Sequence, residues 1–560
     1  MFKSSKRFTL FILLFILVSI TSYLYYGKND DTSPLFVHSY EKHWLTVILM
    51  PLDSRPPCTQ FVEQLARIMG IHLLLPPSEL LDDYKTPGQK EALGNWLYET
   101  SKQADAAIIS TDMLIHGSLV ASRLSSGTPT DVNHVLQLLT TIHQEHPNFK
   151  MYVFNIIPRL ILADSKENAT YQKNMLKYSI LKDQINTFEN SEDIKKITEI
   201  EDKIPVAIRN HYMALYEQND MLNTALINMT EQGIVAGLVI GQDDGQPFGI
   251  PNMSKQKLQH QLQQKTDLEN KVFITRGTDE VALTLLGHIV SELSHYQPRI
   301  FVSYSTAEAS QITMPFMPNT VGKTVEEKIA IAGGLQVDTP DQADFILYVH
   351  VGTKKNKESL KPAAQEVQNL ILQGYKVALV DLTENFQISE TLLPTLLKEN
   401  IDIARLIAYA GWNSTSNSIG TAITQAALFS NALSSETDTS QIIALYKLNL
   451  EFLIARFLDD LYYQKEINPY MNKQLQRVHI DPYNLGAQYY QTNYKIQKLM
   501  FSKTRWFLRE GLQNQPIIIN SHQGTQELFI TDLTIQTYLP WQRTFEIWIK
   551  PTFSLEIKKN

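Results

Sequence analysis

The sequence is poor in cysteine, and this limits what the chain can build. Its 560 residues include one cysteine, Cys58, which excludes an internal disulfide framework and any metal site rich in thiolates. Positive charge is also in short supply, since the formal net charge is −8. Nucleic acid is therefore not expected as the main partner, because a protein that binds the phosphate backbone needs a basic face.

Several catalytic motifs are missing as well. The chain contains no G-x-S-x-G nucleophile elbow and no G-x-x-x-x-G-K-[ST] loop, which disfavours a serine hydrolase of that type and a P-loop nucleotide site. It also has no H-E-x-x-H pair, so a zinc site of that kind is disfavoured. Internal repeats and low-complexity tracts are absent, and the length favours two or three domains.

The N-terminal segment differs from the rest because it is apolar and follows three basic residues. A helix over the apolar run 8–26 would be about 28 Å long, close to the roughly 30 Å core of a bilayer. We predict a transmembrane signal-anchor at 1–26 and a polar tether at 27–42, with the C-terminal bulk extracellular at the cell membrane of a Gram-positive bacterium. A cleaved signal peptide is the alternative, although no A-x-A-like site follows the run.

Short apolar runs then alternate with longer amphipathic ones. This order predicts an α/β fold with mostly parallel sheets in two α/β domains, and a barrel-like first domain is the alternative. The predicted strands are Leu45–Leu52, His72–Leu75, Ala106–Ser110, Lys150–Ile156, Val235–Ile240, Val272–Thr275, Ile300–Ser303, Phe345–Val349, Lys376–Asp381 and Ala404–Ala410.

Changes in pattern suggest where the domains divide. We predict a first α/β domain at 43–297, interrupted by a charged helical insertion at 160–232, and a second α/β domain at 298–436. Residues 437–560 form a helical and β C-terminal region, in which the period-two alternation after Pro516 predicts an antiparallel β segment.

Polar side chains follow the predicted strands where each strand ends. Ligands of open α/β sheets and of barrels bind beyond the carboxyl ends of the parallel strands, so we expect these groups to share one edge. The candidates are Asp53, Arg55, Asp112, His116, Arg123, Arg159, Asp243, Asp244, Arg276, Asp279, Glu280, Trp412, Asn413 and Asn417. The arginines would orient carboxylates or clamp an anionic group, and Trp412 with its asparagines would hold a ring.

Each candidate also has a structural explanation. Asp53 suits an Asx turn, Asp243 and Asp244 suit a turn before Gly245, and Glu280 suits a helix start, where carboxylates favour the dipole. Only the concentration of such groups at several strand ends favours a site.

The segments "MPLDSRP", "STDMLIHGSLVASR", "GQDDGQPFG", "AYAGWNSTSNSIGTAI" and "LPWQRTFEI" together resemble the bacterial family called domain of unknown function 4127. The resemblance covers about residues 44–550 and implies no established activity. His116 stands where the family pattern leads us to expect an aromatic residue.

The first functional hypothesis is a hydrolase acting on carbohydrate or cell-wall glycan. Glycoside cleavage needs a protonated and an ionised carboxyl group. Asp243 or Asp244 is expected to be the ionised member, and Asp112 or Glu280 the acid, with its pKa raised by burial or by a neighbouring carboxylate.

Two other hypotheses remain open. The acidic groups could bind Mg²⁺ or Ca²⁺ through oxygen ligands in a metal-assisted enzyme, although no metal ligand or cofactor is assigned. The chain could instead be a non-catalytic receptor for a glycan or oligosaccharide, held at the membrane by its N-terminal helix. A free carboxyl group with a raised pKa favours catalysis, whereas fully paired carboxylates favour binding.

Overall fold

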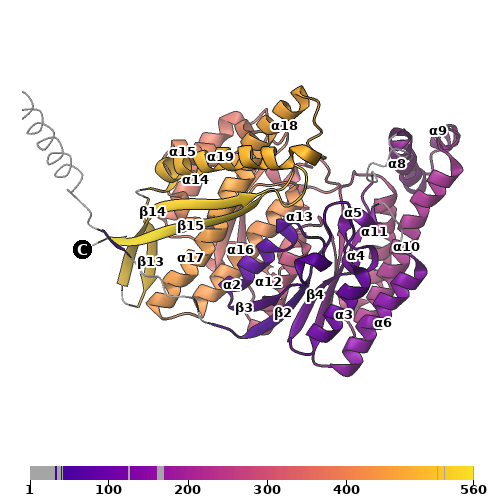
Figure 1. Cartoon of the computed structure of the whole chain (residues 1–560), viewed down its shortest axis with the longest axis horizontal. Coiled ribbons are helices and arrows are strands. Elements are labelled where there is room, and N and C mark those ends of the chain that lie inside the picture. The colour runs from indigo at the N-terminus through magenta and orange to yellow at the C-terminus, as the bar shows by residue number, and fades with distance from the viewer. Residues whose placement is uncertain are drawn as a thin grey trace, which may run out of the picture.

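The computed structural model describes residues 32–34, 40, 42–123, 127–160, 170–513, 515–522 and 524–558. Two parallel sheets and one antiparallel sheet form its framework, with the first sheet at one end and the antiparallel sheet toward the other (Figure 1). The predicted α/β fold with mostly parallel sheets is confirmed, and both parallel sheets are open rather than barrel-like.

The first sheet has the order β3-β2-β4-β5-β6-β7 and is parallel throughout. Its central strands are continuous buried apolar runs, as expected for strands covered on both faces. The chain order reverses between β2 and β4, where such sheets tend to bind ligands. The strands are β2 (Leu45–Met50), β3 (Ile71–Leu74), β4 (Ala106–Ser110), β5 (Lys150–Ile157), β6 (Gly237–Gln242) and β7 (Val272–Arg276).

The second sheet has the order β12-β11-β10-β8-β9 and is also parallel. Its strands are β8 (Arg299–Tyr304), β9 (Leu335–Gln336), β10 (Phe345–Gly352), β11 (Val377–Thr383) and β12 (Ala408–Ala410). The last of these is shorter than predicted, because Ile403–Arg405 form a 3-10 turn before it.

Four helices connect the two sheets through a common core. One buried apolar cluster includes side chains of both sheets and of these helices, so no solvent layer separates the sheets. The helices are α2 (Gln60–Ile68), α12 (Val281–Ser294), α13 (Val321–Ile331) and α16 (Thr415–Ser434). The predicted boundary between 297 and 298 stays a prediction.

Small residues let α12 and α16 pack closely. A Cβ atom added at Gly420 of α16 would lie 2.6 Å from Cγ of Glu280 and 3.1 Å from Cγ2 of Thr284. Every residue of α16 from Thr415 to Ala432 is buried, which explains the small-residue composition of this segment.

Other helices cover the outer faces of the two parallel sheets. On the first sheet these are α3 (Lys90–Ser101), α4 (Thr111–His116), α5 (Leu119–Ser122), α6 (Pro129–Glu145), α10 (Val206–Glu231) and α11 (Ile250–Gln263). The predicted helical insertion is confirmed, because α8 (Gln172–Phe188), α9 (Ser191–Glu201) and α10 lie between β5 and β6. The second sheet is covered by α14 (Leu360–Leu372), α15 (Leu393–Lys398) and α17 (Thr439–Arg456).

The C-terminal region continues α17 into a π-helix, Phe457–Ile467, followed by α18 (Asn468–Arg477) and α19 (Tyr489–Phe507). The predicted antiparallel β segment is confirmed as a sheet of order β1-β15-β14-β13. Its strands are β1 (Thr32–Pro34), β13 (Ile517–Ser521), β14 (Gly524–Tyr538) and β15 (Trp548–Lys558).

The structure offers no helix that could cross a bilayer within the residues it describes. The predicted anchor at 1–26 lies outside those residues.

Candidate functional site

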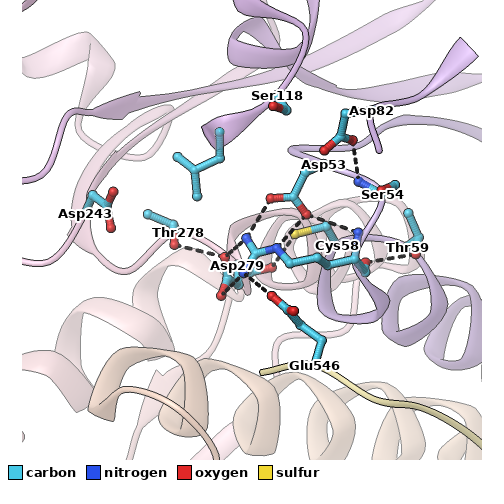
Figure 2. A network of polar contacts seen from close by, with 12 residues as sticks. Asp53, Ser54, Cys58, Thr59, Asp82, Ser118, Asp243, Thr278, Asp279 and Glu546 are labelled. Carbon is cyan, nitrogen blue, oxygen red and sulfur yellow. Dashed lines mark hydrogen bonds and ion pairs between the residues drawn. The ribbon is translucent and has the colours of Figure 1, made fainter. Parts of the chain in front are cut away.

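Three helices of the common core begin at the same place. The loops after β2, β7 and β12 lead into α2, α12 and α16, and polar side chains of these three loops contact one another. A helix N-terminus carries partial positive charge, so the N-termini of these three helices favour carboxylates in the loops that precede them. Figure 2 shows the resulting network of side chains.

Arg55 is the centre of that network. Its Nε and Nη2 donate to the two oxygens of Asp53 at 2.9 and 2.6 Å, and Nη2 also donates to Asp279 Oδ1 at 2.7 Å. Arg55 is 6 % exposed and Asp53 is fully buried. Burial alone would raise the pKa of Asp53, but the charge and hydrogen bonds of Arg55 outweigh it and lower that pKa. The same two carboxylates raise the pKa of Arg55 against the effect of burial.

Asp279 connects the two parallel sheets through further hydrogen bonds. Asn413 and Asn417, which follow β12, donate their amide groups to its Oδ2 at 3.2 and 3.4 Å. Thr278 donates to its Oδ1 at 3.1 Å. Asn413 adopts a φ of 48°, a left-handed conformation that asparagine tolerates better than most residues. The polar residues after β12 therefore fix a carboxylate of the other sheet.

The connection between β14 and β15 also reaches this network. Glu546 Oε1 lies 3.7 Å from Arg55 Nη1, and Glu546 forms a second ion pair with Arg543. The Trp541 indole donates to Ser54 Oγ at 2.9 Å, while Tyr84 stacks on Trp541 with ring centroids 5.3 Å apart. Residues far apart in the sequence thus enclose one side of the site.

Asp82 lies next to the network without an arginine of its own. Its Oδ1 accepts from the backbone N–H of Ser54 at 2.8 Å, whereas its Oδ2 is buried without a partner. Burial and the charge of Asp53 raise the pKa of Asp82 to about 8, so its carboxyl group is protonated at neutral pH. Burial, and then the charge of Asp53, also raise the pKa of the Cys58 thiol well above its usual value. A buried thiol of this kind is a poor nucleophile.

A second pair of carboxyl groups follows β6. Arg123 donates from Nε and Nη2 to Asp243 Oδ2, at 2.9 Å for Nε, and Asp243 is 5 % exposed. Its neighbour Asp244 donates its backbone N–H to Asp243 Oδ1 at 2.8 Å, while its own side chain is exposed. The protein packed around the Asp244 carboxyl group, and then the charge of Asp243, raise the pKa of Asp244 to about 6. The charges of Arg123 and Arg159 oppose this rise. The loop that carries Asp244 lies beside the loop that carries Asp279, because the Gly277 N–H donates to the Gln242 carbonyl at 3.0 Å.

Asp112 is enclosed behind Asp243. It is 1 % exposed, and its Oδ2 accepts from the backbone N–H of Ile156 at 3.0 Å. Burial raises the pKa of Asp112 to about 7. With His116 and Ser122 it lines a cavity of about 20 Å³, a space of the size of a water molecule.

Three further candidates, Glu280, Arg276 and Trp412, are buried. Glu280 and Lys328 form a fully buried ion pair with an N–O distance of 2.5 Å. Burial raises the pKa of Glu280 although Lys328 opposes the rise. Arg276 is buried with Nε and Nη1 unpaired, and desolvation lowers its pKa to about 10. The Trp412 ring is 6 % exposed and packs edge-on against Phe61, so it offers no open face to a sugar.

A further buried cluster contacts the loop after β12. Asp460 accepts from Gly411 N at 2.8 Å and from Arg456 Nη1 at 2.8 Å, and Lys465 donates to the Gly411 carbonyl. These side chains come from α17 and the π-helix, an uncommon element that often marks functional regions. Burial, despite the charge of Arg456, raises the pKa of Asp460 to about 7.

Sequence reasoning missed Asp82 and the π-helix cluster, and Glu546 was not among its candidates. Asp82 and Asp83 come after β3 but are separated from it by a 3-10 turn at Ser78–Leu80. Asp459 and Asp460 lie inside a helical pattern. Neither pair therefore directly follows a strand. The signal for the second pair was its composition, two adjacent acids among apolar residues.

Across the residues with assigned positions, no three His, Cys, Asp or Glu side chains are arranged to hold a metal ion. The acidic groups are instead held by arginines and amides. This donor set fits direct hydrogen bonding to a ligand better than Mg²⁺ or Ca²⁺ coordination.

A family model described as protein of unknown function (DUF4127) matches residues 47–550. The chain belongs to this family. The match spans both parallel sheets and ends inside β15, so all the groups described above lie within the DUF4127 region. No curated protein and no solved structure matches the chain.

Proposed function

We propose that this DUF4127 protein is a membrane-anchored extracytoplasmic hydrolase that acts on carbohydrate or cell-wall glycan. The observation that carries the proposal is a pair of adjacent carboxyl groups with different environments. Asp243 is held by Arg123, while Asp244 is exposed and has a pKa raised to about 6. Glycoside cleavage uses two carboxyl groups, one of which donates a proton to the leaving oxygen.

In this proposal Asp244 is the proton donor and Asp243 the ionised group. Protonation of the leaving oxygen by Asp244 would break the glycosidic bond, and the charge of Asp243 would stabilise the positive charge that develops on the sugar. Water then completes the hydrolysis and returns a proton to Asp244. Asp112 also has a raised pKa, but at 1 % exposure it is out of reach of a substrate.

The Arg55 network would orient the substrate rather than react with it. Asp53 and Asp279 are both paired with Arg55, so we assign neither of them a reactive role. The amide of Asn413 contacts Asp279, and Arg159 acts on the charge of Asp244; we assign both to binding sugar hydroxyls. We assign Glu280 and Trp412 to holding the loops in place.

The test compares the full-length protein with Asp244→Asn on cell-wall glycan and on oligosaccharides, with released reducing ends as the measurement. Loss of a general acid lowers the rate by about 10² to 10⁴. Asp338→Asn is the matched control, because Asp338 is an exposed carboxylate on the loop after β9. Equal activity of wild type and Asp244→Asn would refute the assigned role.

A glycan receptor is the second candidate, because the carboxylates around Arg55 are all paired. A glycan that raises the melting temperature by mass action but is never cleaved would support it. Activity that EDTA abolishes and Mg²⁺ or Ca²⁺ restores would instead favour the metal-assisted enzyme.

A further inference from the structure

Aromatic rings of α19 lie exposed to solvent. Tyr490, Tyr494 and Phe501 share one face of the helix, and Trp506 lies further round its exposed side. Tyr490 is 81 % exposed, Tyr494 56 %, Phe501 49 % and Trp506 39 %. The buried side of the helix carries Thr492, Ile496, Met500 and Thr504, and α19 is fixed to the C-terminal sheet by Gln497, which donates to the Thr537 carbonyl at 2.6 Å. Rings that are amphipathic or apolar and lie on an exposed helix face suit a boundary between water and an apolar phase.

The same face is basic, although the protein as a whole is acidic. Residues 489–512 contain one acid, Glu510, and the net charge of the chain is −8. Lys498 lies over the Tyr494 ring, with Nζ 4.6 Å from the centroid. Lys495, Lys498 and Arg505 are exposed cations of α19, whereas Lys503 pairs with Glu466 and Arg509 pairs with Glu510.

A hollow of about 770 Å³ opens beside this face. Phe501, Trp506, Arg505 and Arg509 line it from the helical side, and Asp532 and Leu533 of β14 line it from the sheet. The hollow is open to solvent, and its rim combines two guanidinium groups with rings and one carboxylate. A phosphate-bearing headgroup matches both features, since arginine binds phosphate oxygens in pairs.

The position of α19 relative to the N-terminus points to the source of such headgroups. β1 pairs with the end of β15, in the sheet that α19 covers. Only residues 27–31 separate β1 from the apolar run 8–26, and six residue steps span at most about 21 Å. The position of this sheet rests on the membrane anchor of the proposed function: an anchor at 8–26 would hold it close to the bilayer surface.

We propose that the exposed face of α19 docks on an anionic lipid surface. The rings enter the interfacial layer while the lysines and arginines face the headgroup phosphates. Docking in this way fixes the orientation of the protein above the membrane.

The test places a fluorophore on this face in the full-length chain. Ser502 is exposed on the rim of the hollow, and Cys58 is buried, so a bimane label reacts selectively with Ser502→Cys. Asn95→Cys on α3 is the matched control, being exposed on the outer side of the first sheet. Both proteins are reconstituted in vesicles of phosphatidylcholine, with or without phosphatidylglycerol, that carry a lipid-attached quencher.

We expect quenching at position 502 well above that at position 95, only with phosphatidylglycerol, and reversal by salt of about 1 M. Lys495→Gln/Lys498→Gln should lower the ratio of docked to undocked protein about fivefold for each cation removed. Lys354→Gln/Lys355→Gln, two exposed lysines after β10, should leave the ratio unchanged.

Equal quenching at the two positions, or equal quenching on neutral and anionic vesicles, would overturn the proposal. A label at position 502 that responds to a soluble acidic polysaccharide and not to lipid would overturn it too. That result would make α19 a binding face for an acidic glycan.

Discussion

A single guanidinium group holds together side chains from three parts of the chain. Arg55 contacts Asp53 in its own loop, Asp279 after β7 and Glu546 in the C-terminal region. All of these groups are nearly or fully buried, so each charge depends on the others for the solvation that it lost. The site is for this reason also a structural junction.

Arg55→Ala should destabilise the protein by about 3 to 5 kcal/mol, because it leaves buried carboxylates without a counter-charge. Urea denaturation would measure the change in the free energy of unfolding. Arg299→Ala is a matched control, since Arg299 is 53 % exposed and pairs with Asp344 at the surface. Such surface pairs contribute about 1 kcal/mol or less. A loss at Arg55 no larger than at Arg299 would contradict the central role given to it.

Asp82 should make stability depend on pH. Its pKa of about 8 lies above the unfolded value, so the folded protein binds the extra proton and stability falls as pH rises from about 4 to 8. Asp82→Asn imitates the protonated form and should remove this fall, which amounts to at most about 1.4 kcal/mol per pH unit. Denaturation midpoints of both proteins, measured at several pH values between about 5 and 8, would show whether this fall in stability is removed. Parallel curves for the two proteins would refute the assignment.

At the scale of elements, the long buried strands could be predicted because their apolar runs are continuous. β4 has the predicted bounds, and β5 differs by one residue. The two-residue β9 and the π-helix were not predictable, since neither has a periodic pattern of its own. Strand-exit residues such as Asp53 and Asp243 were found because parallel strands end at a common edge. Asp82 and Glu546 reach the site only through tertiary folding.

The contact between α12 and α16 leaves no room for a methyl group at Gly420. Gly420→Ala should destabilise by about 1 to 3 kcal/mol through overpacking, although alanine favours helices over glycine by about 1 kcal/mol. Gly94→Ala in α3 is the control, because its added Cβ would meet only Leu138 at an ordinary 3.6 Å. That variant should be neutral or slightly stabilised. Thermal denaturation would compare them, and equal shifts would argue against a tight contact.

At the scale of the molecule, the two parallel sheets share one core and should unfold together. Calorimetry should show a single transition for both sheets, whose enthalpy agrees with the van't Hoff value. Leu286→Ala, in the middle of that core on α12, should lower the free energy of unfolding by about 2 to 5 kcal/mol and move the single transition to a lower temperature. Leu372→Ala is the control, because Leu372 is 66 % exposed on α14. Separate transitions, of which Leu286→Ala shifts only one, would show independent domains.

The state of Cys58 has a consequence for where the protein can work. Its sulfur is sealed inside the fold and held in the protonated form, while peroxide and thiol reagents attack exposed thiolates. Oxidants therefore find no reactive sulfhydryl on the native chain. In an oxidising compartment the native protein would need no reducing partner and would not cross-link to its neighbours through this thiol.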